Sequence, residues 1–129
     1  MRKICKPGTP VISCPPSTIQ KQCDVFTHFP FISISRACDG AVIPIYRTFT
    51  TSLPTVTIDI DNTGTCPITV IVEHRNSPIP IMEVIQPDLD FAMTVEFVTS
   101  ISIQCSTSTE PENECNFSVG LDISNCICC

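Results

Sequence analysis

The residues of this 129-residue chain that could do chemistry are its ten cysteines. Thiols at this density form disulfides, ligate a metal, or act as nucleophiles and redox groups. Six of the ten lie near the ends of the chain, and these are Cys5, Cys14, Cys23, Cys126, Cys128 and Cys129. The other four lie in the interior of the sequence, and these are Cys38, Cys66, Cys105 and Cys115. Their spacing and their neighbours decide which of these chemistries is open to the chain.

Metal binding is one alternative, because the closing Cys126-Ile127-Cys128-Cys129 resembles a metallothionein-type fragment. Three thiols do not complete the tetrahedral site that zinc prefers. No Cys-x-x-Cys pair occurs, and His28 and His74 lie far from the cysteine clusters in sequence. We therefore expect no metal site and no cofactor, and we keep a small zinc-binding module built from clustered cysteines as the alternative.

Catalysis has little support in the residues. The sequence has no Gly-x-Ser-x-Gly elbow or comparable nucleophile motif that His28 or His74 could activate as a base. A thiol oxidoreductase uses a Cys-x-x-Cys of low pKa at the start of a helix, and both the motif and the helix are missing from the pattern. Asp59 and Asp61 share one face of a predicted strand, which is more often a solvated face than a metal site. We expect that the chain is not an enzyme.

Crosslinking is the remaining use of the thiols. The six cysteines near the chain ends are candidates for disulfides between subunits, and the four interior cysteines are candidate acceptors on the body. Head-to-tail contacts of this kind generate filaments when the rotation between copies does not close. Two alternatives stay open: five bonds within one chain, and Cys115 as a buried free thiol.

The first 23 residues differ from the rest and are predicted to form an extended arm. They carry a net charge of +4 with no acid, from Arg2, Lys3, Lys6 and Lys21. Pro7-Gly8 and Pro15-Pro16 disfavour a helix. The remaining residues carry three arginines against thirteen acids, a net charge of −10. An acidic body repels phosphate, so we expect no nucleic-acid partner and interpret the arm as docking on the body of a like subunit; a solvated tail with incidental charge is the alternative.

Residues 24–123 are predicted to form an all-β body, and residues 124–129 a short cysteine-rich C-terminal tail. About eight short strands are expected within Phe26–Arg36, Ala41–Thr50, Thr55–His74 (two strands), Ile79–Gln86, Phe91–Val98, Ser100–Cys105 and Glu114–Ile123. Many short strands separated by turn residues indicate a β-sandwich, and eight of them favour a jelly roll. An immunoglobulin-like sandwich is the runner-up, although the chain has no Trp for its usual core.

The clearest local prediction is a β-hairpin over Thr55–His74. Apolar residues alternate along both limbs, and Gly64 in the connection can adopt the left-handed conformation of a three-residue hairpin loop. That loop length would pair Ile58 with Ile68. Further along, Phe91, Met93, Val95 and Phe97 are expected on one face of a strand.

Prolines mark three places in the predicted strands where the backbone hydrogen bonding to a neighbouring strand should be interrupted or absent. Pro44 predicts a break or bulge in the second strand, and Pro67 an edge-like start to the fourth. Pro80 predicts an edge or bulge in the strand that begins at Ile79.

No apolar run is long enough to span a membrane, and the basic N-terminus is not followed by the apolar region of a signal peptide. We therefore expect synthesis in the cytoplasm. Ten cysteines in a protein made in a reducing compartment present a conflict, which oxidation after cell lysis or after exposure of the assembly would resolve.

A cysteine-bearing arm ahead of an all-β body resembles the endospore appendage (Ena) pilus subunits of Bacillus-group bacteria. The similarity includes Pro87-Asp88-Leu89-Asp90-Phe91, Ser100-Ile101-Ser102-Ile103 and Cys115-Asn116-Phe117-Ser118-Val119 in the final third of the chain. The closing cysteines also resemble those of cysteine-rich spore-coat and exosporium crust proteins.

The resemblance implies a jelly-roll subunit that is made in the mother cell and assembles with copies of itself into a fibre, or surface layer, on the spore. It implies that Cys5 and Cys14 match connector thiols, and that Cys38 and either Cys105 or Cys115 match acceptors. Other spore-surface proteins are further expected partners. The alternative of another class is an adhesin-type sandwich that stays monomeric.

Overall fold

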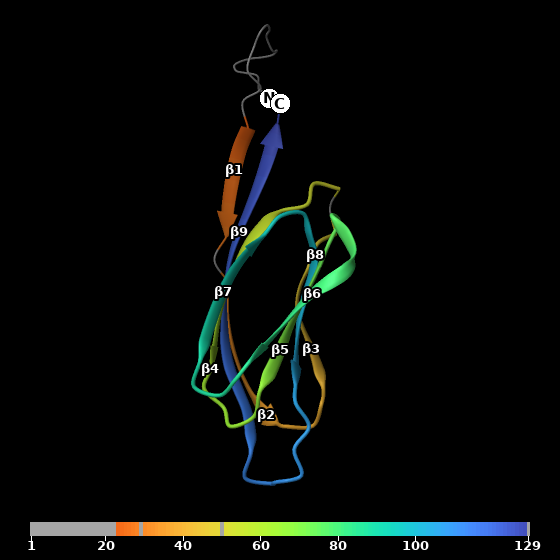
Figure 1. Ribbon diagram of the computed structural model, residues 1–129. Helices are drawn as coiled ribbons and strands as arrows, with labels where there is room; N and C mark the ends of the chain where they lie inside the picture. The colour runs from red at the N-terminus through yellow and green to blue at the C-terminus, as the bar shows by residue number, and fades with distance from the viewer. Residues whose placement is uncertain (1–22, 29, 50, 129) are drawn as a thin grey trace, which may run out of the picture. The chain divides into compact units, whose positions relative to one another are not determined.

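The computed structural model describes residues 23–28, 30–49 and 51–128, and these residues form β-structure without a helix (Figure 1). The strands are β1 (Cys23–His28), β2 (Phe31–Ala37), β3 (Val42–Arg47), β4 (Thr55–Asn62), β5 (Ile68–His74), β6 (Ser77–Ile85), β7 (Asp90–Val95), β8 (Val98–Cys105) and β9 (Glu114–Cys128). The part of the chain that the structure describes holds no helix long and apolar enough to cross a membrane.

The chain divides into two compact units. The body is His28–Ile123, which contains β2 to β8 and most of β9. The second unit is formed by the two chain ends, of which the structure describes β1, paired with β9, and the last residues of β9. The body therefore has the eight strands that the sequence predicts.

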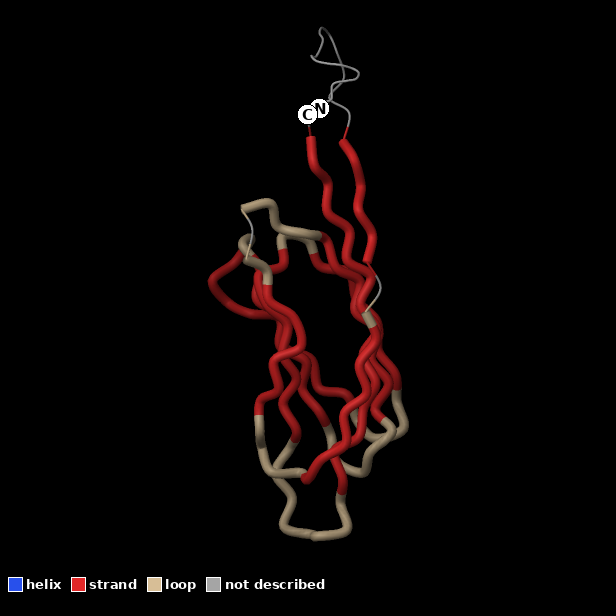
Figure 2. Tube along the Cα trace, turned by 180° about the vertical axis from the view of Figure 1, so that it is seen from behind, coloured by secondary structure: helices blue, strands red, loops and turns tan. Residues whose placement is uncertain are grey.

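Two sheets face each other in the body, as the strand traces of Figure 2 show. One sheet has the order β2-β9-β4-β7, and the other has the order β3-β8-β5-β6. Consecutive strands alternate between the sheets except β5 and β6, which are neighbours in one sheet. This connectivity is that of a jelly roll, so the predicted fold is confirmed.

The core lies between the sheets and is built from the alternating apolar residues of the central strands. Inward-facing positions of β4, β5, β8 and β9 are fully or nearly buried: Val56, Ile58, Ile60, Ile68, Val70, Val72, Ile101, Ile103, Phe117, Val119 and Leu121. Their period of two places every second side chain on the core face. The alternation of apolar residues predicted for both limbs of Thr55–His74 is therefore confirmed in β4 and β5.

The predicted β-hairpin is wrong, although both of its strands exist. β4 pairs with β7 and β9, whereas β5 pairs with β6 and β8 in the opposite sheet. Two strands whose apolar faces meet across a core have the same alternation as two strands side by side. The pattern therefore fixes which face is buried but not which strand is the neighbour.

The connection between β4 and β5 crosses from one sheet to the other, and buried Asn62 holds it. The Asn62 side-chain amide donates to the carbonyls of Cys66 at 3.1 Å and Ile85 at 2.9 Å, and its oxygen accepts from the Gly64 amide at 3.0 Å. Gly64 does not have the positive φ that was expected. It is needed because a Cβ here would meet the β9 backbone at the Glu114 carbonyl and, at 2.5 Å, the Asn116 amide.

Further expectations are corrected in detail. The first predicted strand is two strands, β1 and β2, separated at Pro30. Phe97 lies beyond β7 at a φ of 57° and is exposed, so it leaves the face that Phe91, Met93 and Val95 share. Pro67 precedes an interior strand and not an edge strand.

The other two prolines lie as predicted. The β3–β8 register shifts between Pro44 and Tyr46. Pro80 belongs to β6, which is an edge strand.

Candidate crosslinking site

The four body cysteines form two disulfides within the chain. Cys38 is bonded to Cys66, with Cα atoms 6.5 Å apart, and Cys105 is bonded to Cys115, with Cα atoms 6.0 Å apart. Both separations lie in the usual range for disulfides. Cys115 is therefore not a free thiol.

Both disulfides join the two sheets at the same end of the core. Cys38 follows β2 and Cys66 precedes β5, whereas Cys105 ends β8 and Cys115 lies on β9. All four cysteines are at most 5% exposed. A thiolate must reach a disulfide sulfur to exchange with it, so burial shields these bonds from thiols of other molecules.

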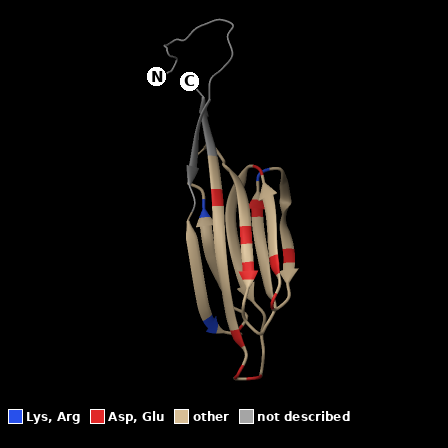
Figure 3. Cartoon of the chain, turned by 90° about the vertical axis from the view of Figure 1, so that its left-hand side faces the viewer, with Lys and Arg blue, Asp and Glu red and all other residues tan. Residues whose placement is uncertain are grey.

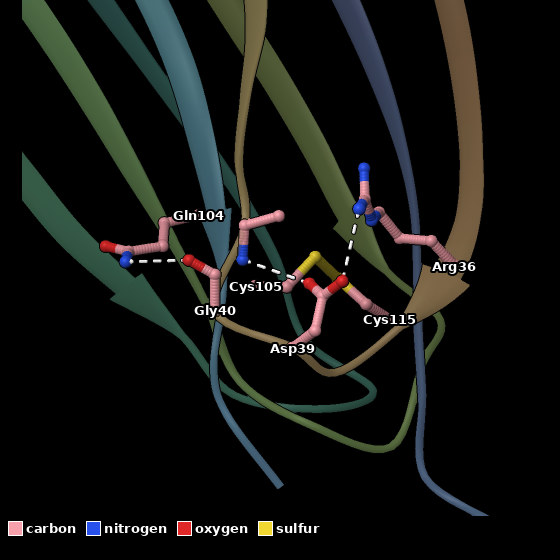
Figure 4. A network of polar contacts seen from close by, with 7 residues as sticks. Arg36, Asp39, Gly40, Gln104, Cys105 and Cys115 are labelled. Atoms are coloured by element: carbon pink, nitrogen blue, oxygen red, sulfur yellow. Dashed lines mark hydrogen bonds and ion pairs between the residues drawn. A yellow bond between two sulfur atoms is a disulfide. The ribbon is translucent and has the colours of Figure 1, made fainter.

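The turn after β2 positions the Cys38 backbone next to the end of β8. Gly40 has a φ of 80°, and the carbonyl of this glycine accepts from Gln104 Nε2 at 3.1 Å (Figure 4). Glycine adopts this left-handed conformation without the steric cost of a Cβ. Gly40 directly after Asp39 is a turn signal in the sequence, and the structure has a turn there.

The carboxyl group of Asp39, in this turn, has a lowered pKa. Its Oδ1 accepts from the Ala41 amide at 3.0 Å, and its Oδ2 pairs with Arg36 at 3.2 Å (Figure 4). The hydrogen bond from Ala41, followed by that from the Arg36 guanidinium, lowers the pKa of the carboxyl below its ordinary 3.8. Both contacts stabilise the ionised form.

The structure does not describe the side chains of the six candidate crosslinking cysteines near the chain ends. Cys5, Cys14 and Cys129 lie outside the described residues altogether. Cys23 lies at the start of β1, and Cys126 and Cys128 lie on the last part of β9, where the backbone alone is described. Their role in bonds between subunits stays a prediction.

The prediction that the body cysteines accept bonds from a neighbour also stays a prediction. The structure adds that such a bond would have to replace an internal disulfide, because each body cysteine already has a partner in its own chain. Among the described residues, no three His, Cys, Asp or Glu side chains are grouped to hold a metal ion.

One surface that the sequence reasoning missed is the exposed apolar part of β6. This strand is at the edge of its sheet, and it exposes Ile79 by 73%, Met82 by 55% and Val84 by 60%. An edge strand presents unpaired backbone groups, which proteins usually guard with charge or proline, and β6 carries Pro78, Pro80 and the exposed Glu83 beside its exposed apolar residues. The sequence signal was the apolar run Ile79-Pro80-Ile81-Met82, which reads equally well as core.

No family profile matches the chain, and no curated protein matches it. Among solved structures, the chain is similar to a subunit of Bacillus endospore appendages, described as a novel family of disulfide-linked pili. The TM-score is 0.58 at 15% identity, over 88% of this chain and 96% of that chain. A structure of the infectious bursal disease virus Gx strain aligns at a TM-score of 0.44 and 13% identity, over 92% of this chain and 36% of that chain. The chain therefore has the jelly-roll fold of a Bacillus endospore appendage subunit.

Proposed function

We propose that this protein is the structural subunit of a disulfide-crosslinked fibre or surface layer on the bacterial spore, assembled from copies of itself. In this proposal residues 1–23 are the arm, 24–123 the body and 124–129 the tail. Cysteines of the arm and the tail bond neighbouring subunits. The protein has no catalytic role, is made in the mother cell and is finally located outside it.

The observation that carries the proposal is that the cysteines fall into two groups, one in the body and one near the chain ends. The jelly-roll body of this chain uses its four cysteines in buried internal bonds. The six other cysteines lie in the two short terminal segments of the sequence, which hold 29 of the 129 residues. Such a concentration of thiols at chain ends suits bonds that join one copy to the next.

Each crosslink forms when two cysteine thiols lose two protons and two electrons and their sulfur atoms bond. Molecular oxygen, or a small disulfide that is reduced in exchange, accepts these electrons. Oxidation after release from the mother cell reconciles synthesis in a reducing compartment with a crosslinked product. The order of events also lets subunits find their positions before covalent bonds fix them.

The edge strand β6 supports an assembling role independently of the cysteines. Its exposed apolar residues and unpaired backbone edge fit the addition of a strand from another copy. Such pairing supplies register, and the disulfides then resist separation.

The experiment compares the full chain with a variant that lacks residues 1–23, both oxidised in air and alkylated before denaturing electrophoresis. We expect a ladder or unentered material from the full chain that collapses to monomer on reduction, with matching fibres in electron micrographs. The truncated variant should keep the circular dichroism of a folded β protein and form fewer crosslinks.

A full chain that runs as monomer in both lanes would contradict the proposal and favour a monomeric sandwich. Stoichiometric zinc in protein purified without chelator would favour the zinc-binding module. An unfolded truncated variant would show that the proposed division between arm and body is wrong.

A further inference from the structure

The outer face of the sheet β3-β8-β5-β6 is largely uncharged. Two rows of outward-facing residues cross its four strands in register, and these neutral rows are Val42-Gln104-Thr69-Val84 and Pro44-Ser102-Ile71-Met82. Their apolar members near the two edges are open to solvent, because Val42, Met82 and Val84 are 54%, 55% and 60% exposed. An apolar surface of this kind marks a contact site.

The outer face of the opposite sheet carries acids instead. Asp59 and Asp61 point outward from β4, and Asp61 lies opposite Asp90 of β7. Figure 3 shows acidic residues along neighbouring strands of that sheet. Two copies of a chain of net charge −6 repel each other through such surfaces. The neutral rows are therefore a part of the body where two copies can approach closely.

At one end of the neutral rows the face carries one charge of each sign. Arg47 of β3 and Glu73 of β5 lie on either side of Ser100 of β8 in the next row. The Ser100 hydroxyl donates to Glu73 Oε1 at 3.1 Å. Arg47 is exposed and forms no ion pair within the described part of the chain. A guanidinium and a carboxylate are thus both available to groups outside the chain.

The arrangement of these residues is complementary to itself. Aligned sheets pack face to face about 10 Å apart. A two-fold axis parallel to the strands, between β8 and β5, lays β8 over the β5 of a second copy and β3 over its β6. Val42 then meets the second copy's Val84, and Pro44 meets its Met82. Arg47 of each copy comes within reach of Glu73 of the other, one strand spacing to the side.

We infer that this face packs on the same face of a second copy about a two-fold axis. Such a contact closes on itself and cannot extend a fibre. It joins two neighbouring fibres or layers side by side, a consequence that rests on the proposed function.

The contact is weak for a single pair of subunits. The spacing of the strands and the rise along them make the four-stranded face roughly 400 Å². A stable interface buries about 800 Å² on each partner. Repetition of the contact along two fibres supplies the strength that one copy lacks.

The test mixes two charge-reversal variants of the full chain, R47E and E73R, with their free thiols alkylated. Each variant alone brings like charges together at both ion pairs, whereas the mixture restores two pairs of opposite charge. Labelled R47E is titrated with E73R and followed by sedimentation velocity. We expect R47E to bind E73R roughly tenfold more tightly than either variant binds itself.

The matched control for charge is E110R, which changes the net charge as E73R does but lies in the exposed loop between β8 and β9. It should bind R47E more weakly than E73R does, because one like-charge pair remains. Equal binding of R47E to E73R and to E110R would overturn the inference. A mixture that associates no more tightly than its members alone would overturn it too.

A second pair of variants tests the centre of the face without charge reversal. Ser102→Asp, on the interior strand β8, should abolish the self-association of the alkylated wild type. Ser118→Asp makes the same change at a half-buried position on the interior strand β9 of the opposite sheet and should leave the association intact. Equal effects of the two substitutions would contradict the inference. The crosslinked-fibre proposal is judged separately, by electrophoresis of the protein that has not been alkylated before oxidation.

Discussion

At the scale of single residues, Gly64 is the position where a methyl group should do most harm. A Cβ there would collide with the β9 backbone at Glu114 and Asn116. Because β9 contributes buried side chains to the core, it cannot move away without disturbing the packing. We expect Gly64→Ala to lower the free energy of unfolding by about 1–3 kcal/mol or more, as overpacking does. Urea unfolding of the unassembled protein measures this change.

Gly120→Ala is the matched control for this prediction. Its Cβ would meet its neighbours at ordinary van der Waals distance, 3.7 Å from Phe31. The free energy of unfolding should therefore change little. A Gly64→Ala variant as stable as Gly120→Ala would contradict the close packing of the crossing loop against β9.

Asp39 predicts a pH dependence of stability with a definite sign. Its pKa is lowered in the folded protein by the Ala41 amide and by Arg36, so its contribution is fully present above the unfolded pKa of about 4. The contribution is lost as the pH falls through the lower, folded pKa. The stability advantage of the wild type over Asp39→Asn should therefore be constant near neutral pH and shrink as the pH falls below about 4, measured by urea unfolding. An advantage that is constant or grows on acidification would show that this contact does not stabilise the ionised form.

The burial of single residues was predictable from the sequence where apolar and polar residues alternate clearly. The buried faces of β4 and β5 followed from the alternation of apolar residues along Thr55–His74. Pairing of the cysteines did not follow, because spacing along the chain says nothing about which sulfur atoms meet across two sheets. The need for Gly64 was also hidden, since it arises from contact with a strand about fifty residues away.

At the scale of elements, the two disulfides tie the sheets together over loops of different length. Cys38–Cys66 closes a separation of 28 residues, and Cys105–Cys115 one of 10. In the chain-entropy model, loss of the longer link costs about 4 kcal/mol and loss of the shorter about 3. We expect the variant C38A/C66A to be less stable than C105A/C115A by about 1 kcal/mol, measured by urea unfolding of both. The reverse order would show that packing around Cys105 and Cys115 outweighs chain entropy.

The edge strand β6 gives a prediction about assembly. Met82→Lys and Val84→Lys place charge on an exposed edge, which should leave folding intact because both side chains face outward. We expect fibre formation, followed by light scattering, to slow in both variants. Thr109→Lys, on the exposed loop after β8, is the control for added charge. Equal slowing in all three variants would mean that net charge, and not this edge, is responsible.

The failure of the hairpin prediction has a physical cause at this scale. Alternation along Val56–Ile60 and Ile68–Val72 specifies a buried face for each strand. In a jelly roll most consecutive strands cross the core, so a short connection does not imply pairing. The backbone bonds of Thr63 and Thr65 to Asn116 and Glu114, which hold the crossing, have no local sequence signature.

At the scale of the whole molecule, charge and cysteines are unevenly distributed along the chain, as the proposed assembly requires. The first 22 residues are basic, and the rest of the chain is acidic. The internal disulfides stabilise the body, and the terminal cysteines are placed in sequence where contacts between copies can reach them. Both features were predictable, because they depend on composition and position and not on the path of the chain.

The central claim is that the terminal cysteines join different copies, and mixed-isotope mapping tests it most directly. Equal amounts of ¹⁴N- and ¹⁵N-labelled subunits are assembled together, alkylated, digested without reduction and analysed by mass spectrometry. We predict disulfide-linked peptide pairs of mixed isotope for Cys5, Cys14 or the Cys126–Cys129 tail, and pairs of a single isotope for Cys38–Cys66 and Cys105–Cys115. Single-isotope pairs for every cysteine would contradict the account, because all bonds would then lie within one chain.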